Sequence, residues 1–461
     1  MMRRCTLEEV ARFSGGRLVK GDPALGVERL HTDTRTLAAG DCFVALRGDR
    51  FDGHAFVREV RSRGAVAALV SNRVAEAPDD LGLVEVPDTL QGLQRFAATY
   101  RSMLPVRTIG VTGSSGKTST KELIAAVLRT KFRTKATEGN LNNHIGVPLT
   151  LLRLEEDDEF GVIEMGMNHP GEIAPLAHMA APEFGVISSI GPAHIEFFTS
   201  QQAIAEEKAA LIAALPPKGA AILNSDDLWS REIAHRASAR VVWVGNGPGS
   251  TWQAEEISVS PEGIDFQLEH EGARVAVHLP VMNRVMVGNA LLAAAVGGEC
   301  GLSLEEIAQG ISAVELPGAR MQVVEIGGVS IINDAYNANP SSMKAALVAL
   351  REFPKARRRI AVLGSMGELG QYAAALHLEV GAYAHAQEVD YLIAVGPHAD
   401  AYLLGARGAG LTRVARAFDA AEATAALKEI LQEGDAVLVK GSRFMGLERL
   451  VESLGGAGGT H

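Results

Sequence analysis

The chain has 461 residues, of which 47% are hydrophobic and 21% are charged. This composition supplies apolar material for about three compact domains and excludes both a small disulfide scaffold and a disordered chain. Lysine and arginine number 44 and aspartate and glutamate 55, so the net charge of −11 disfavours a nucleic-acid partner but allows a local basic pocket for an anionic substrate.

The sequence also bears on membranes and metals. No uncharged apolar run approaches the roughly 18 residues of a membrane span, and the N-terminus MMRRCTLEEVARF lacks the apolar segment of a secretory signal. The three cysteines are far apart and form no C-x-x-C pair, which indicates neither a disulfide framework nor a thiolate zinc site. We therefore expect a cytoplasmic protein without membrane insertion.

The first 104 residues predict a small α/β unit. Thr6 and Glu9 form a capping-box pattern at a helix start, and Gly15-Gly16 end that helix. Short apolar runs at residues 42–46, 65–70 and 83–86 predict strands, with a helical or turn-like segment at 55–63 between the first two. A longer helical pattern at 89–104 precedes the next unit.

Apolar runs then alternate with helical segments. Runs at 106–111, 161–164, 184–190, 220–223 and 241–244 predict buried strands of a parallel sheet. Three runs with partial period-two character, at 256–259, 264–269 and 274–279, predict a small antiparallel insert before an Ala-rich helix at 289–296. Beyond residues 316–318, strands at 360–363, 391–395 and 436–439 alternate with helices at 343–350, 374–386 and 421–431. The pattern predicts three α/β domains: 1–104, 105–316 and 317–461.

A phosphate-loop pattern follows the strand at 106–111, where residues 109–120 read IGVTGSSGKTST. Glycines let backbone amides turn toward a phosphate, the following helix N-terminus adds positive potential, Lys117 can neutralise β and γ oxygens, and Thr118 can ligate magnesium. The general pattern G-x-x-x-x-G-K-[ST] has Val111 in place of its first glycine. A Gly/Ser turn without a nucleotide is the alternative, and the strand–helix context favours the phosphate loop.

Segments on both sides of this loop resemble the Mur ligase family. Residues 112–118 (TGSSGKT) are similar to its phosphate loop and residues 137–148 (TEGNLNNHIGVP) to its next motif. Residues 162–166 (VIEMG) and 168–173 (NHPGEI) resemble the member that adds D-alanyl-D-alanine, and residues 32–35 (TDTR), 40–46 (GDCFVAL) and 48–54 (GDRFDGH) resemble that member's uridine-nucleotide domain. Residues 333–340, 364–370 and 439–443 are similar to C-terminal motifs, so the resemblance covers about residue 27 to residue 443.

The resemblance implies a fold and a role for each matching residue. The fold is α/β, with a central P-loop-type parallel-sheet domain between an N-terminal α/β substrate domain and a C-terminal Rossmann-like α/β domain. The implied ATP-binding residues are Thr112, Gly113, Ser114, Ser115, Gly116, Lys117, Thr118, Asn289, Arg320 and Asp334. The implied magnesium ligands are Thr118, Glu164, His194 and Lys208, the last as a carbamate; the catalytic residues are Lys117, Lys208, His194 and Arg320. The implied substrate-binding residues are Thr32, Asp33, Thr34, Arg35, Gly48, Phe51, Asp52, His54, Asn140, Asn142 and Asn143.

Without the resemblance, several of these residues have ordinary interpretations. Glu164 would be a solvated strand-end residue, His194 a structural histidine and Lys208 an exposed helix lysine. The adenine-facing motif departs from relatives, because it retains Asn289 alone where they often carry two asparagines, and Met286 nearby is expected in the helix core.

The resemblance implies ATP-dependent amide ligation by a monomer. The carboxylate of UDP-N-acetylmuramoyl-tripeptide would join the amine of D-alanyl-D-alanine through an acyl phosphate, with Mg²⁺. A ligase for another carboxylate, of the folylpolyglutamate or cyanophycin type, is one alternative, and the motifs at 32–35 and 48–54 argue against it. The other alternative is a non-catalytic nucleotide-binding partner. Such a protein needs no metal ligands, so the ligands implied here argue against it.

Overall fold

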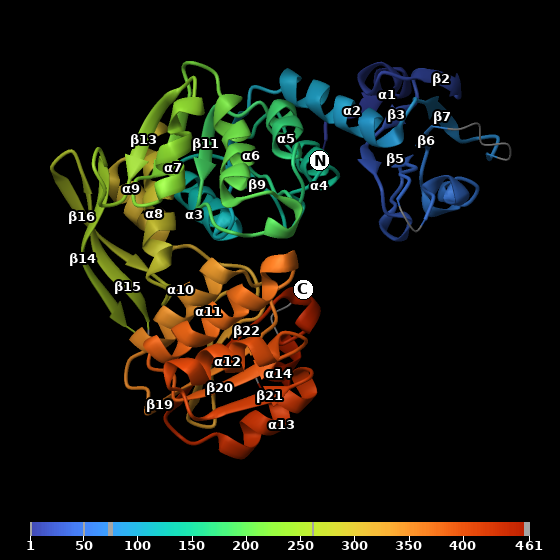
Figure 1. Ribbon diagram of the computed structural model, residues 1–461. Coiled ribbons are helices and arrows are strands. Elements are labelled where there is room, and N and C mark those ends of the chain that lie inside the picture. Colours follow the sequence, from blue (N-terminus) through green and yellow to red (C-terminus); the bar gives the residue numbers. More distant parts are fainter. Residues whose placement is uncertain (1, 49–50, 72–76, 261, 456–461) are drawn as a thin grey trace.

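The computed structural model describes residues 2–48, 51–71, 77–260 and 262–455. Figure 1 shows three α/β units, with the middle unit between the other two and helix α2 (Thr89–Met103) leading into it from the first. The three-domain α/β prediction is confirmed. None of the helices in the described part of the chain is both long and apolar enough to cross a membrane.

The N-terminal unit is built on a five-stranded sheet of order β2-β7-β6-β5-β4, in which β4 to β7 are parallel. The capping box of Thr6 and Glu9 begins α1, and Gly15 ends it in the left-handed conformation, as predicted. The segment at 55–63 forms two short 3₁₀ helices. The elements are α1 Leu7–Ser14, β1 Cys5–Thr6, β2 Arg17–Lys20, β3 Gly26–Val27, β4 Arg29–His31, η1 Thr34–Thr36, β5 Asp41–Val44, η2 Gly53–Phe56, η3 Val60–Arg63, β6 Ala67–Val70 and β7 Gly82–Glu85.

The middle unit has a nine-stranded sheet of order β16-β15-β14-β13-β12-β11-β8-β10-β9. Its strands β8 to β13 are parallel. Strands β8, β10, β11 and β12 are largely buried, as their continuous apolar runs predict, whereas β9 and β13 are partly exposed. The elements are β8 Arg107–Thr112, α3 Lys117–Arg129, β9 Thr134–Ala136, α4 Gly146–Leu151, β10 Phe160–Glu164, α5 Ile173–Ala180, β11 Phe184–Ile187, η4 Ile195–Phe197, α6 Gln201–Ala213, β12 Ala220–Asn224, α7 Leu228–Ile233, η5 Ala234–Arg236, β13 Arg240–Val244, β14 Trp252–Ser260, β15 Gly263–His270, β16 Ala273–Leu279, α8 Val285–Glu299 and α9 Leu304–Ser312.

The sequence patterns did not indicate strand β9, and two further details of this sheet differ from the sequence expectation. The antiparallel strands β14 to β16 exist, but they extend the parallel sheet instead of forming a separate insert, because Val244 of β13 pairs with Trp252 of β14. Strand β11 ends at Ile187 and not at residue 190. The reason is that Ser188 and Ser189 form hydrogen bonds with the phosphate loop. The Ser189 carbonyl accepts from the Ser114 amide, and both serine hydroxyls donate to the Ser115 carbonyl.

The C-terminal unit has a six-stranded sheet of order β17-β18-β22-β19-β20-β21, parallel apart from β17. The predicted strands and helices are present, together with three strands and two α-helices that the sequence patterns did not indicate: β17, β18, β21, α12 and α14. The elements are β17 Gln322–Ile326, β18 Val329–Asp334, α10 Pro340–Glu352, β19 Arg358–Gly364, η6 Gly370–Tyr372, α11 Ala373–Ala386, β20 Tyr391–Val395, α12 Ala399–Ala409, β21 Val414–Ala417, α13 Ala420–Ile430, β22 Asp435–Lys440, η7 Arg443–Met445 and α14 Glu448–Ser453.

A buried histidine fixes the loop that follows β19. The Nε2 atom of His377 accepts a 2.9 Å hydrogen bond from the Met366 amide, so Nδ1 carries the proton and donates to the Ala373 carbonyl at 2.6 Å. The side chain is 0% exposed, and burial lowers the pKa of His377 to about 4 from the ordinary 6.5. A protonated ring would have no acceptor for Met366, so this loop requires the neutral imidazole.

We expect His377 to make the stability of the C-terminal unit depend on pH. Because its pKa is lower in the folded than in the unfolded state, the unfolded chain binds more protons between pH 4 and 6.5, and stability falls as pH falls through this window. The pKa difference corresponds to about 3 kcal/mol. Urea unfolding across this pH range, followed by hydrogen-exchange mass spectrometry of peptides from residues 358–386, measures it. His377→Gln should make the free energy of unfolding less dependent on pH than in the wild type, whereas the exposed control His385→Gln should not. Parallel pH dependences for all three proteins would contradict the role given to His377.

Candidate functional site

The phosphate-loop residues form a tight turn between β8 and α3, at the carboxyl edge of the sheet. Gly113 has φ of +154° and Gly116, the N-cap of α3, has φ of +81°. A Cβ on Gly113 would collide with Ser188 Oγ, and one on Gly116 would lie 3.0 Å from the Asn289 amide nitrogen. Glycine is therefore required at both positions. The turn leaves the first amides of a 13-residue helix without intrahelical partners, an arrangement that attracts anions.

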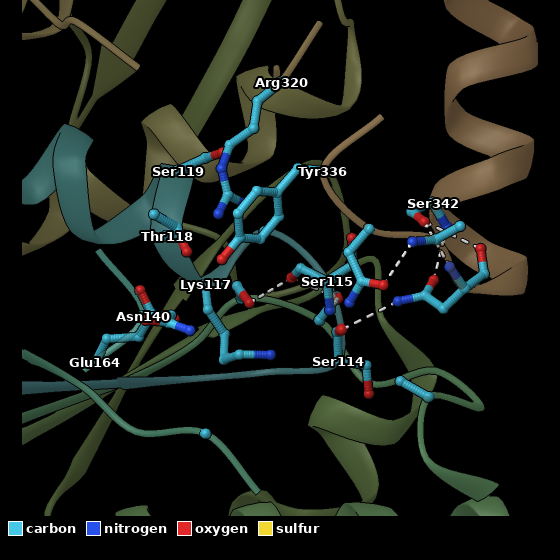
Figure 2. A pocket seen from close by; sticks show the side chains of 18 of the residues that line it. Ser114, Ser115, Lys117, Thr118, Ser119, Asn140, Glu164, Arg320, Tyr336 and Ser342 are labelled. Atoms are coloured by element: carbon cyan, nitrogen blue, oxygen red, sulfur yellow. Dashed lines mark hydrogen bonds between the residues drawn. The ribbon is translucent and has the colours of Figure 1, made fainter. Parts of the chain in front are cut away.

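Lys117 lies along this turn, as Figure 2 shows, and its Nζ donates to the Gly113 carbonyl at 2.8 Å. Burial lowers the pKa of the ammonium group. The charge of Arg320 acts in the same direction, and Glu164 and Glu368 oppose it. The cation therefore lies in a poorly solvated position, where its attraction for an anionic ligand is strong.

Glu164 ends β10 as a buried carboxylate, contrary to its ordinary interpretation as a solvated residue. Asn142 donates to Oε1 at 2.8 Å, and the Glu164 amide donates to Thr137 Oγ1 at 2.9 Å. Buried Lys121 donates to the carbonyl of the same threonine at 2.6 Å. The Oε2 atom has no hydrogen-bond partner among the described residues although it is buried. A buried carboxylate oxygen without a donor is suited to receive a cation.

His194 reaches the same cleft from the loop after β11, with φ of +61°. Its Nδ1 lies 2.5 Å from Oε2 of Glu368, which belongs to the C-terminal unit and also has a positive φ, of +59°. The imidazole lowers the pKa of Glu368. The Glu196 amide donates to the Glu368 carbonyl at 3.3 Å, so this contact joins the two units.

Lys208 lies on α6 and is buried, so its interpretation as an exposed helix lysine is wrong. Burial is the main reason why the pKa of its amine lies well below the ordinary value, and the charge of Lys117 lowers it further. None of the described residues forms a hydrogen bond or an ion pair with this amine. Burial therefore shifts the equilibrium of this amine toward its neutral form.

The C-terminal unit contributes the opposite wall of the cleft. Arg320 lies over the ring of Tyr336, with its guanidinium carbon 4.0 Å from the ring centroid, and Figure 2 shows the pair facing the phosphate loop. Asp334 accepts a 2.6 Å hydrogen bond from buried Lys440. The Asn339 side chain caps α10 and also donates to the Ser114 carbonyl at 3.2 Å, which couples this wall to the phosphate loop.

Asn289 and Met286 lie at the start of α8, on the edge of the cleft nearest to Gly116. The Asn289 amide contacts the Met286 sulfur at 3.3 Å, and both side chains are buried. Met286 thus belongs to the apolar core, as expected, and lines the cleft as well.

These walls enclose a cleft of about 680 Å³ between the middle and C-terminal units. It brings together most of the sequence-predicted residues: Ser114, Ser115, Gly116, Lys117, Thr118, Asn140, Asn142, Asn143, Glu164, His194, Asn289, Arg320 and Asp334. Two of the predicted asparagines already have partners, because Asn142 orients Glu164 and Asn143 accepts from the Ile145 and Gly146 amides. Thr112, Gly113 and Lys208 are not among the described residues that line the cleft.

The predicted N-terminal residues lie elsewhere, after adjacent parallel strands of the first sheet. Asp33 caps η1 and pairs with Arg35, which lowers the pKa of Asp33 to about 2. Asp52 caps η2 and contacts His54 Nδ1 at 2.5 Å. The motifs with Thr32 and Thr34 follow β4, and those with Gly48 and Phe51 follow β5, so all face the carboxyl edge of that sheet, where ligands of α/β folds bind. Asp49 and Arg50 of the second motif lie outside the described residues.

The residues of the cleft that carry charge or aromatic surface and that the sequence reasoning did not select include Glu368, Tyr336, Arg443 and Phe444. Tyr336, Glu368 and Arg443 stand in segments that resemble family motifs, and Phe444 directly follows one of these segments. For Glu368, Arg443 and Phe444 the available signal was their position shortly after predicted strands of the third domain, where parallel sheets place their ligand-binding side chains. Tyr336 follows β18, which the sequence patterns did not indicate.

Comparison with family models finds three consecutive matches. The Mur ligase middle domain matches residues 111–297, the Mur ligase glutamate ligase domain matches residues 319–443, and the Mur ligase family catalytic domain matches residues 27–101.

Curated relatives extend over nearly the whole chain. The UDP-N-acetylmuramoyl-tripeptide--D-alanyl-D-alanine ligase of Bacillus subtilis is 36% identical over 459 residues, covering 98% of this chain and 99% of the relative. The enzyme of the same name from Escherichia coli is 37% identical over 460 residues, covering 97% of this chain and 98% of the relative.

Solved structures agree with these relatives. A crystal structure of MurF from Acinetobacter baumannii has a TM-score of 0.91 at 32% identity, covering 98% of this chain and 99% of that one. MurF ligase from Thermotoga maritima in complex with ADP has a TM-score of 0.83 at 28% identity, covering 93% of this chain and 97% of that one. A folylpolyglutamate synthase from Mycobacterium tuberculosis, at 17% identity and a TM-score of 0.64, covers 80% of this chain and 94% of that one and shares the fold.

Proposed function

The chain belongs to the Mur ligase family, and on that premise we propose that it joins UDP-N-acetylmuramoyl-tripeptide to D-alanyl-D-alanine with ATP, releasing ADP and phosphate. The product is UDP-N-acetylmuramoyl-pentapeptide, a precursor for peptidoglycan synthesis. The observation that carries the proposal is the joint presence of the phosphate loop, an unpartnered buried carboxylate and a cationic facing wall in one cleft. The reaction takes place in the cytoplasm and needs one copy of the chain.

The chemistry explains why the cleft combines these parts. A carboxylate is a poor acyl donor, because oxide would have to leave when an amine attacks. Transfer of the γ-phosphoryl group to the carboxylate oxygen gives an acyl phosphate, and attack by the dipeptide amine then expels phosphate. Two anions must approach one another in the first step, so positioning and electrostatic stabilisation carry most of the catalysis.

The nucleotide-binding role falls to the residues around the phosphate loop. The amides of residues 113–118 and the Lys117 ammonium bind the β- and γ-phosphates, and Arg320 reaches the triphosphate from the facing wall. Asn289 and Met286 lie where an adenine would extend from the loop. Asp334, which accepts a hydrogen bond from Lys440, faces the nucleotide from the C-terminal unit.

The donor set near Glu164 fits Mg²⁺. Glu164 Oε2, the Thr118 hydroxyl and the His194 imidazole would hold it, and the ion would supply charge neutralisation for the phosphate oxygens. Lys208, as a carbamate, would add a further anion near these three magnesium ligands. Its neutral amine can attack carbon dioxide, form a C–N bond and lose a proton to water, which converts a buried amine into a carboxylate-like group.

We expect Asn142→Ala to weaken magnesium binding about 10-fold or more, because the Asn142 amide orients the Glu164 carboxylate. The measurement is the Mg²⁺ concentration that gives half-maximal phosphate release, together with direct titration of Mn²⁺ binding by electron paramagnetic resonance. Asn246→Ala, an exposed asparagine of the same unit outside the cleft, serves as the control. An unchanged metal affinity in Asn142→Ala would show that this hydrogen bond is dispensable.

The uridine nucleotide is bound by the N-terminal unit in this proposal. Two loops at one sheet edge provide the guanidinium of Arg35, turn amides and the exposed ring of Phe51. The first loop carries Thr32, Asp33, Thr34 and Arg35, and the second carries Gly48, Phe51, Asp52 and His54. Asn140, Asn142 and Asn143 lie at the entrance of the middle unit and would meet the peptide end of the same substrate. Domain boundaries at 104/105 and 316/317 separate these binding tasks.

The decisive experiment is magnesium-dependent phosphate release from ATP, with UDP-N-acetylmuramoyl-tripeptide and D-alanyl-D-alanine supplied separately and together, followed by mass analysis of the product. Release that requires both substrates, with a pentapeptide product, is expected. Release with other carboxylates instead would favour a ligase of the folylpolyglutamate or cyanophycin type. Absence of ATP turnover with every substrate present would favour a non-catalytic nucleotide-binding partner.

A further inference from the structure

Lys121 is a buried lysine that the proposed mechanism does not use. It stands on α3 about one helical turn after Lys117, its side chain is 1% exposed, and it is not among the described residues that line the cleft. A fully buried lysine is uncommon, because its ammonium group loses hydration. The contacts that offset this loss therefore indicate what the side chain does.

The Lys121 ammonium group has two oxygen partners. Its Nζ lies 2.5 Å from Oε1 of Glu122, the next residue of α3, and this contact offsets the charge. The same atom donates to the Thr137 carbonyl at 2.6 Å. Thr137 follows β9 and begins the asparagine loop, residues 137–143, which carries the predicted asparagines. Lys121 thus ties the phosphate-loop helix to the start of this loop.

Thr137 lies where the pairing of β9 with β10 ends. Its amide donates to the Val162 carbonyl at 2.9 Å, as in a parallel ladder. If the ladder continued, the Glu164 amide would donate to the Thr137 carbonyl. It donates instead to Thr137 Oγ1, at 2.9 Å. The hydroxyl therefore replaces the carbonyl at the end of the ladder, and the carbonyl is left to accept from Lys121.

Glu164 is held at both its backbone and its side chain by this arrangement. Its amide donates to Thr137, and its carboxylate accepts from Asn142 of the asparagine loop at 2.8 Å. The Gly166 amide donates to the Asn142 carbonyl at 2.8 Å, which closes the loop onto the residues after β10. Residues 138–140 between the two contacts are exposed. The place of Asn142 therefore depends on where the loop begins.

We propose that Lys121 is a positioning residue for the metal site. By holding the Thr137 carbonyl it fixes the asparagine loop, and through Thr137 and Asn142 it orients the Glu164 carboxylate. This inference rests on the proposed function, in which Glu164 holds Mg²⁺. Because Lys117 and Lys121 stand on one helix, α3 sets both the ammonium that binds phosphate and the carboxylate that binds the metal. Their separation is thereby fixed, as simultaneous contact with one metal–phosphate group requires.

The test is Mn²⁺ binding, measured by electron paramagnetic resonance with ADP at one fixed concentration, so that no turnover is needed. Lys121→Met should weaken Mn²⁺ binding about 10-fold, because it removes a hydrogen bond that supports a metal ligand. Lys131→Met, an exposed lysine just beyond the end of α3, removes the same charge and should leave the affinity unchanged. Glu122→Gln keeps an oxygen acceptor for Lys121 and should also bind Mn²⁺ as the wild type does.

Substitutions at Thr137 test the same path with a smaller change, in case Lys121→Met does not fold. Thr137→Val removes the hydroxyl that accepts from the Glu164 amide and should weaken Mn²⁺ binding about 10-fold, whereas Thr137→Ser keeps a hydroxyl and should bind as the wild type does. Lys121→Met combined with Asn142→Ala should weaken binding little more than either change alone, because both act on one loop. Thermal unfolding of each variant verifies the fold.

The outcomes separate this inference from the function on which it rests. If Glu164→Gln binds Mn²⁺ as tightly as the wild type, the metal assignment and the positioning role both fall. If Glu164→Gln loses the ion while a folded Lys121→Met keeps it, or if the effects of Lys121→Met and Asn142→Ala multiply in full, the positioning role alone is overturned. A wild-type protein that binds Mn²⁺ through Glu164 and does not ligate the two substrates overturns the proposed function alone.

Discussion

Replacement of Lys117 with methionine is expected to abolish ligation in a protein that still folds. Methionine keeps the length and apolar contacts of the lysine stem. It removes the charge that, in the proposed function, offsets repulsion between the γ-phosphate and the substrate carboxylate. We expect kcat to fall by about 1,000-fold or more, because preorganised charge at a phosphoryl group is among the largest catalytic contributions. Stability should be unchanged or higher, since burial already disfavours the ammonium.

The measurement for Lys117→Met is phosphate release with all substrates, beside circular dichroism and thermal unfolding of the same preparation. Lys218→Met, an exposed lysine of the same unit without a described partner, controls for loss of one positive charge. Normal turnover in the folded Lys117→Met variant would overturn the phosphate-loop assignment.

Lys208→Ala is likewise expected to be inactive, with kcat reduced about 1,000-fold. The substitution removes a buried amine for which the described part of the chain offers no hydrogen bond or ion pair, and it leaves a helix-compatible alanine on α6, so the fold should persist. The space left behind can admit a small carboxylate. If the carbamate is the active form, formate or acetate should therefore restore part of the activity.

Two further measurements sharpen the Lys208 test. Wild-type enzyme in ¹³C-bicarbonate should show a carbamate carbon by NMR, and Lys208→Ala should not. Lys208→Arg keeps a positive charge and cannot form the carbamate, so it should remain inactive with or without added carboxylate. Full activity of Lys208→Ala would remove Lys208 from the mechanism.

Short-range features of this site were accessible from the sequence because they depend on a few consecutive residues. The turn at Gly113 and Gly116, the capping box of Thr6 and the Lys117 position all follow from local backbone preferences. The three-domain order also followed, because alternating apolar runs and helices mark each parallel sheet.

Features that depend on tertiary packing were not accessible. Lys208 follows two glutamates in the sequence, which suggests a solvated helix face, and only the packing of α6 on the sheet buries it. The contact between His194 and Glu368 joins residues from two domains, so no local pattern contains it. Asn142 and Asn143 look equivalent in sequence, yet Asn142 orients Glu164 and Asn143 accepts hydrogen bonds from the Ile145 and Gly146 amides just before α4.

The hydrogen bond from Asn339 to the Ser114 carbonyl has a consequence for inhibitors. The same side chain begins α10 and touches the phosphate loop, so the docking surface of the C-terminal unit and the nucleotide site are one surface. A compound that contacts both walls would enter only while the units are apart and would then hold them together. Such a compound should bind and dissociate slowly, at the pace of domain motion and not of diffusion.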